Sequence, residues 1–188
     1  KANTTAGSNT AIGLQSLFTN TTGANNTATG SQALYSNSTG SYNAAVGESA
    51  LYTNSTGANN VAVGRIALYN NTADDNTAVG YAALTANTTG ANNVAVGKNA
   101  LLANTTAANN VALGMDTLVA NTTGTRNLAI MKNALNSSDT EDDNIAIGYD
   151  SMTTNTAGGT GNVALGNYTL DALTSGDDNI AIGHEALT

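Results

Sequence analysis

Hydrophobic and polar positions recur along this chain in one order with a period of about 17 residues. Each repeat contains the pattern Asn-x-Ala-aliphatic-Gly, as in residues 60–64, and a Leu four residues after the glycine, as in Leu68. A polar Asn-Thr-Thr-Gly or similar stretch follows, as in residues 87–90. Such self-similarity predicts a stack of identical structural units. The anchor glycines are Gly13, Gly30, Gly47, Gly64, Gly80, Gly97, Gly114, Gly148, Gly166 and Gly183, with Met131 in the one remaining place.

The Asn-x-Ala-aliphatic-Gly segment predicts a short β-strand, because its residues alternate and several are β-branched. Alternation places the Asn, Ala and Gly on one side and the residues next to the Ala on the other. Two arrangements are possible. Either the Ala faces the interior of the coil and the aliphatic side chains pack against another molecule or segment, or the aliphatic side chains lie inside. The Leu segment fits a second short strand or a single helical turn equally well.

An Asn lies four residues before every anchor position, which predicts a stacked ladder of side-chain amides. The predicted ladder comprises Asn9, Asn26, Asn43, Asn60, Asn76, Asn93, Asn110, Asn127, Asn144, Asn162 and Asn179.

These features predict an all-β fold, a parallel β-solenoid or β-roll of about eleven 17-residue coils, with room for a short helical turn in each coil. The spacing departs from 17 only by a single 16 before Gly80 and a single 18 before Gly166. We therefore expect residues 1–188 to form one repeat array, a segment of a longer chain or a unit that stacks end to end.

Composition and charge reduce the number of function classes that the chain could belong to. The chain has 13 acidic and 5 basic residues and a net charge of −8, so we expect no nucleic-acid partner, since phosphate binding needs clustered Lys and Arg. No apolar run approaches the roughly 20 residues of a membrane helix, so we expect no membrane insertion. Cysteine is absent and His184 is the single histidine, in a variable position after an anchor glycine. We therefore expect no enzyme, with no catalytic and no cofactor-binding residues.

Acidic pairs at Asp74-Asp75, Asp142-Asp143 and Asp177-Asp178 raise calcium as a candidate ion, because carboxylates beside turn carbonyls are calcium ligands. Solvated turns explain the pairs equally well, and we assign no metal site. The Gly-rich stretch 158–161 lacks the Lys-Ser/Thr of a phosphate loop and is interpreted as an insertion.

The polar turn contains Asn-x-Ser/Thr sequons, which are candidate glycosylation sites in a secreted protein. The main series is Asn20, Asn37, Asn54, Asn87, Asn104 and Asn121. Good turn chemistry explains the same residues without glycans. The rows of Thr also raise an ice-binding solenoid as a minor hypothesis.

Repeats such as residues 76–90 resemble the tandem repeats of phage and large-virus tail fibres and of bacterial adhesin-like surface proteins. The Ala-Val-Gly and Ala-Ile-Gly cores also resemble the head repeat of trimeric autotransporter adhesins, whose period is shorter. This resemblance implies a β-roll in an extracellular, cell-surface or virion-surface protein that self-associates as a homotrimer. End-to-end stacking into a filament is the other form of self-association that we expect. The leading hypothesis is a structural shaft or head segment; the alternative is an adhesin module that binds host or matrix glycans directly.

Overall fold

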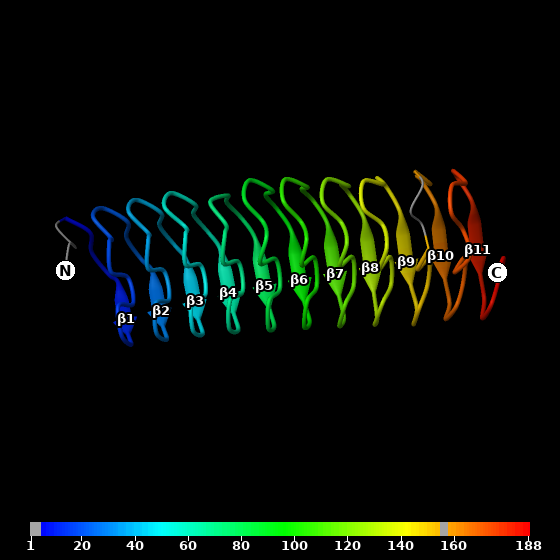
Figure 1. Cartoon of the computed structure of the whole chain (residues 1–188). Helices are drawn as coiled ribbons and strands as arrows, with labels where there is room; N and C mark the ends of the chain where they lie inside the picture. The colour runs from blue at the N-terminus through cyan, green and yellow to red at the C-terminus, as the bar shows by residue number, and fades with distance from the viewer. Residues whose placement is uncertain (1–4, 155–157) are drawn as a thin grey trace.

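A computed structural model describes residues 5–154 and 158–188 of the chain as a rod of stacked coils (Figure 1). Each coil contributes one three-residue strand to a single parallel sheet, in which strand order follows the sequence. No helix lies among the described residues. The strands are β1 (Thr10–Ile12), β2 (Thr27–Thr29), β3 (Ala44–Val46), β4 (Val61–Val63), β5 (Thr77–Val79), β6 (Val94–Val96), β7 (Val111–Leu113), β8 (Leu128–Ile130), β9 (Ile145–Ile147), β10 (Val163–Leu165) and β11 (Ile180–Ile182). The predicted all-β parallel solenoid is confirmed.

Strand register follows the repeat, with the central Ala of each strand paired to the central Ala of the next. Ala45 pairs with Ala62, 17 residues later. The shorter and longer repeats keep this register, since Ala62 pairs with Ala78 and Ala146 with Ala164. The turns therefore absorb the missing and the extra residue, and the sheet continues without a break along the rod.

The central Ala of the strands points into the coil, and the two residues beside it point outward. Ala62 is fully buried, whereas Val61 and Val63 on either side each keep 37% of their surface exposed. Ala suits this position because the interior is thin and a larger side chain would force the walls of the coil apart. Of the two arrangements that the sequence left open, the structure adopts the one with Ala inside.

The Leu segment is neither a strand nor a helical turn. It is an irregular run in which Leu adopts a left-handed conformation, as in Leu84 with φ of 52°. This backbone turns the Leu side chain into the core, where Leu84 is fully buried. The segment bonds to both neighbouring coils: the Leu84 N–H donates to the Ala100 carbonyl at 3.0 Å, and the Ala82 N–H donates to the Arg65 carbonyl at 3.2 Å. The hydrogen-bonded stack therefore extends beyond the sheet.

The anchor glycine ends each strand at a point where adjacent coils almost touch. Gly80 has φ of +140°, and a Cβ built there would lie 2.5 Å from the carbonyl oxygen of Gly97. Only glycine meets both the backbone and the space requirement without strain. Met131 takes this place in β8's coil with φ of 86°, still in the region that disfavours side chains.

Candidate functional site

The predicted Asn series lies at the start of the strands and connects successive coils. The Asn60 backbone N–H donates to Oδ1 of Asn43 at 3.0 Å, and the Asn60 Nδ2 donates to the same oxygen at 3.1 Å. The Asn60 Nδ2 also donates to the Ala73 carbonyl at 2.8 Å. The Asn60 side chain thus links the Asn of the preceding coil to the turn that follows its own strand, which gives this first Asn ladder a structural role.

A second Asn ladder runs through the polar turns. Asn37 Nδ2 donates to Oδ1 of Asn20 at 2.8 Å and to the Gly40 carbonyl at 3.0 Å. The second ladder comprises Asn20, Asn37, Asn54, Asn71, Asn87, Asn104 and Asn121, all with no exposed surface. From the sequence alone these residues are predicted as turn residues and, except for Asn71, as candidate glycosylation sites, and not as a buried ladder. Asn71 is the signal that could have located the ladder. Residues 71–73 form no sequon, yet this turn position is still an Asn, so a structural reason for the Asn was indicated.

This geometry bears on the glycosylation hypothesis. In the folded coil the amide nitrogens of Asn20, Asn37, Asn54, Asn87, Asn104 and Asn121 lie inside, and a glycan requires that same nitrogen at the surface. Glycosylation of these residues stays a prediction, and the folded chain does not offer them to a modifying enzyme.

The second ladder is interrupted at Ser138, and a buried carboxylate fills the gap. Glu141, 2% exposed, occupies a turn position that is Gly124 one coil earlier. Its Oε2 accepts hydrogen bonds from the Ser138 hydroxyl at 2.9 Å and the Asp139 N–H at 2.7 Å, and its Oε1 accepts one from the Gly158 N–H at 3.1 Å. Several donors around one carboxylate offset its loss of hydration. Glu141 therefore acts as a structural replacement for a ladder amide.

Two buried amide oxygens in the described residues have no hydrogen-bond partner, Asn54 Oδ1 and Asn121 Oδ1. Each precedes an irregular coil: Asn54 precedes the 16-residue coil, and Asn121 precedes the interruption at Ser138. The defects in hydrogen bonding thus coincide with the defects in the repeat.

The acidic pairs divide into a structural and a solvent-facing residue. The first Asp accepts a hydrogen bond from a backbone N–H of the preceding coil: Ala58 donates to Asp74 at 2.8 Å, and Thr160 donates to Asp177 at 2.8 Å. Asp142 does the same for the N–H of Thr125. These hydrogen bonds explain why an Asp occurs at the first position of each acidic pair without a bound ion. No cluster of three or more potential metal ligands occurs among the described residues.

The second Asp of one pair forms an exposed ion pair. Asp143 Oδ1 lies 2.6 Å from Nε of Arg126, and Oδ2 lies 2.7 Å from its Nη2. The hydrogen bond from Arg126, opposed by partial desolvation, lowers the pKa of Asp143, and the same contact raises the pKa of Arg126. This pair links adjacent coils at the surface.

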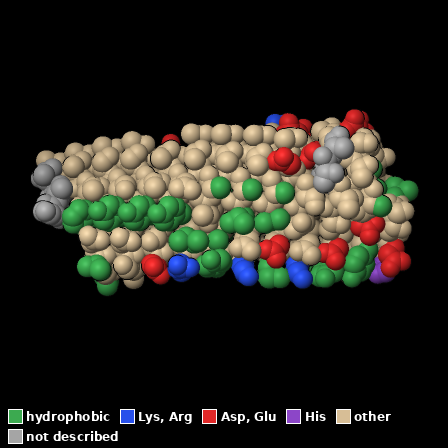
Figure 2. Space-filling view, viewed as in Figure 1, with side chains coloured by type: hydrophobic (Ala, Val, Ile, Leu, Met, Phe, Trp, Pro, Cys, Tyr) green, Lys and Arg blue, Asp and Glu red, His purple; other side chains and the backbone are tan. Residues whose placement is uncertain are grey.

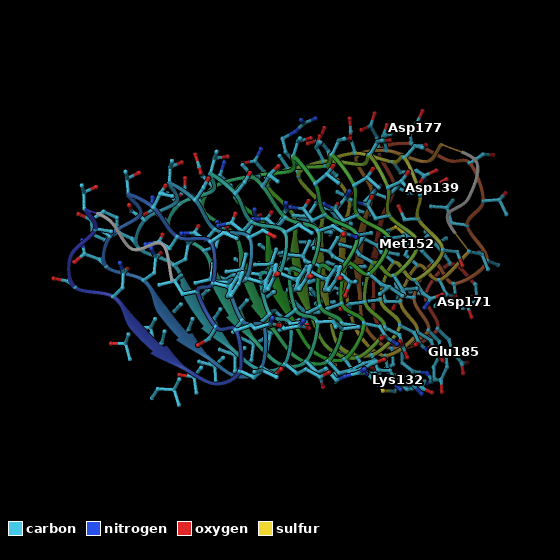
Figure 3. The ribbon with its side chains drawn as sticks, turned by 60° about the vertical axis from the view of Figure 1, so that its left-hand side comes forward. Lys132, Asp139, Met152, Asp171, Asp177 and Glu185 are labelled. Carbon is cyan, nitrogen blue, oxygen red and sulfur yellow. The ribbon has the colours of Figure 1, made fainter. Side chains whose placement is uncertain are left out.

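The position after the anchor glycine forms an exposed row of mixed chemistry. Arg65 Nε lies 3.2 Å from Glu48 Oε2, and its guanidinium lies 6.0 Å from the Tyr81 ring centroid. His184 is exposed at the end of this row, with its ring 5.8 Å from that of Tyr168. Figure 3 shows charged residues along the opposite edges of the coils, with Asp139 and Asp177 on one and Lys132 and Glu185 on the other, and Met152 between them.

An aromatic row that the sequence analysis did not identify lies over the first coils. The rings of Phe18, Tyr35, Tyr52 and Tyr69 stack at centroid distances of 5.0–5.2 Å with interplanar angles of at most 8°. Figure 2 shows a continuous hydrophobic band there, near the N-terminal end. Ring faces cover one another in this arrangement, so the row presents edges and is a poor platform for stacking sugars.

A chemically uniform surface runs along the sheet and is called here the outer sheet face, defined as the first and third residues of β1 to β11. All of its residues are Thr, Ala, Val, Ile or Leu, so the face contains no charge in a chain of net charge −8. Representative side chains are substantially exposed, with Val96 at 38% and Leu165 at 42%.

The described part of the chain has no pocket and no helix long and apolar enough to cross a membrane. Comparisons with protein-family models, with curated proteins and with solved structures found no match to this chain.

Proposed function

We propose that this chain is a structural repeat segment, a stiff shaft or head that spaces other parts of an extracellular fibre, filament or adhesin. The observation that supports this most strongly is the unbroken eleven-strand sheet, in which each strand pairs in parallel with the next. Stability of such a stack grows by nearest-neighbour contacts, so length can increase without a new core.

The distribution of side-chain chemistry also supports a structural role. The buried polar side chains of Asn60, Asn104 and Glu141 each form a hydrogen bond with a residue of a neighbouring coil. His184, the single imidazole, is exposed in a row of variable residues. In this proposal the chain is not an enzyme and needs no cofactor.

The fibre assignment and the surface location rest on the resemblance of the repeats to tail-fibre and adhesin repeats. In that setting, the proposed partners are further copies of this chain, side by side as in a homotrimer or end to end in a filament. Direct binding of host or matrix glycans is the alternative, and the row of polar turns would supply its contacts. Ice binding remains the minor hypothesis, and a thermal-hysteresis assay without activity would dispose of it.

The spacer role is tested by measuring the rod in solution. Because the chain has no cysteine, Thr22→Cys and Thr174→Cys place spin labels at two exposed turns nine coils apart. The labelled chain is diluted with an excess of unlabelled chain, so that only distances within one copy are measured. With about 4.8 Å per coil, we expect a narrow distance distribution centred at about 43 Å by electron–electron resonance. A broad distribution would contradict a stiff rod.

The same unlabelled segment is then applied to glycan arrays and to cell surfaces. A spacer shows no specific retention. Saturable binding to a defined glycan would instead favour the direct-binding alternative, and substitutions along the polar turns would locate the contact.

A further inference from the structure

The outer sheet face runs along all eleven strands and has no role in the interior of its own coils. A strand in a coil shields its own interior through the central Ala, so the outward aliphatic residues contribute nothing to that core. Ile145 and Val96 keep more than a third of their surface exposed although neighbouring strands flank them on both sides. Large exposed apolar surfaces that are rimmed by polar residues mark interaction sites.

The surroundings of this face match that description. Two residues before most strands lies an exposed polar position, such as Asn59 or Arg126, and the exceptions are Tyr42 before β3 and Gly161 before β10. Two residues after the third strand residue lies the mixed row that contains Arg65 and Lys98. An apolar strip between polar rims is the usual anatomy of a protein–protein interface.

The face also has a gradient along the rod. In β1 to β5, Thr occurs at Thr10, Thr27, Thr29 and Thr77, and Ala at Ala44. In β6 to β11, every residue of the face is Val, Leu or Ile. The face therefore changes from partly polar to wholly aliphatic toward β11, the end coloured red in Figure 1.

We infer that the outer sheet face binds the same face of another copy of this chain, with the two rods parallel and in register. A second copy is the partner that matches the repeat of the face, because its side-chain rows recur at the same coil spacing. Parallel alignment sets the aliphatic half against the aliphatic half and Thr against Thr. Antiparallel alignment would instead bury Thr hydroxyls against aliphatic side chains, without hydrogen-bond partners.

The area is sufficient for this role. Ten strand spacings of about 4.8 Å and a strand of about 10 Å give a strip of roughly 500 Å² on each copy. Two strips together bury about 1,000 Å², the lower bound for a specific interface, before the polar rims are included. This inference does not depend on the spacer role, because a single rod could act as a spacer.

Light scattering tests the association and its surface. The native chain should have a mass that is a multiple of 18.7 kDa. Val96→Lys combined with Leu165→Lys should reduce the mass to that of one chain. Thr88→Lys combined with Thr106→Lys, which adds the same charge at exposed turns, should keep the multiple. The spin-label distance between positions 22 and 174 shows whether each variant remains a rod.

Orientation is tested with Thr22→Cys alone, which reports distances between copies. Parallel rods bring the two labels to one level, so only the width of the paired rods separates them. Antiparallel rods add about 38 Å along the axis. A monomer up to the limit of solubility, an assembly that survives the two Lys substitutions on the face, or the long antiparallel distance would each overturn the inference.

Discussion

Oδ1 of Asn76 accepts two hydrogen bonds from Asn93, one from its backbone N–H at 2.9 Å and one from its Nδ2 at 3.2 Å. The Asn93 Nδ2 continues to the Ala107 carbonyl at 2.9 Å, and its Oδ1 accepts from the Asn110 N–H at 3.0 Å. A single amide therefore joins three successive coils.

Asn93→Ala should lower the free energy of unfolding by about 1–3 kcal/mol, because the Asn110 N–H stays buried without its acceptor and the Ala107 carbonyl keeps only the hydrogen bond from Asn104 Nδ2. Chemical denaturation monitored by circular dichroism measures the change. Asn92→Gly is the matched control: Asn92 is exposed with φ of 60°, a conformation that glycine adopts freely, and should change stability little. Equal losses in the two variants would mean that the ladder contributes nothing specific.

Leu84→Ala should destabilise the chain by about 2–5 kcal/mol, because it opens a cavity in a fully buried position. Leu102 occupies the adjoining half-buried row, and Leu102→Ala should cost less than half as much. Denaturant midpoints of the two variants give the comparison. A larger loss of stability for Leu102→Ala would contradict the assignment of Leu84 to the core.

Met131→Gly should stabilise the chain by about 0.5–1 kcal/mol. Relief of the left-handed conformation of Met131 exceeds the added entropy of glycine in the unfolded chain. Met115→Gly tests whether relief of backbone strain is the cause. Met115 is also exposed but lies outside the left-handed region, so glycine there should destabilise the chain. Thermal unfolding should therefore show shifts of opposite sign; a loss of stability in Met131→Gly would refute the strain argument.

Asp143 should titrate below the ordinary range of an aspartate, because Arg126 lowers its pKa. A lowered folded-state pKa contributes stability above the unfolded pKa, and this contribution is lost as pH falls through the folded value. The pair is exposed, so its effect on stability should be small and reduced by salt. Carbon-detected NMR titration of the carboxyl group measures the shift, and Arg126→Gln should return the pKa toward its ordinary value. A titration unchanged by that substitution would show that the ion pair does not form.

The repeat period, the parallel stack and the first Asn ladder were accessible from the sequence, because each follows from periodicity at positions such as Asn60. The second ladder was not. Asn-Thr-Thr-Gly has the composition of an exposed turn, and burial of Asn37 depends on the stacking of neighbouring turns, which local propensity does not report. The left-handed Leu84 was equally inaccessible, because intrinsic preference opposes that conformation and only the packed core selects it.

The outer sheet face illustrates a different limit. Alternation around Ala62 showed that two kinds of side chain face opposite ways, but both assignments satisfied the same pattern. The interior of the coil is thin, so only the small Ala side chains fit inside. That thickness depends on the path of the whole coil, which the local pattern does not report.

The central claim is that one coil is the unit from which the rod is built, and removal of one coil tests it most directly. Deleting residues 81–97 takes out one complete repeat and joins Gly80 to Lys98, so each remaining strand keeps its register and its ladder contacts. Deleting residues 81–89 removes about half a coil and puts the following strand out of position. The measurement is the cooperative unfolding transition followed by circular dichroism. We expect the complete-coil deletion to unfold cooperatively with a slightly lower midpoint, and the half-coil deletion to lose much of the native signal. Equal damage from both deletions would contradict a stack of interchangeable coils.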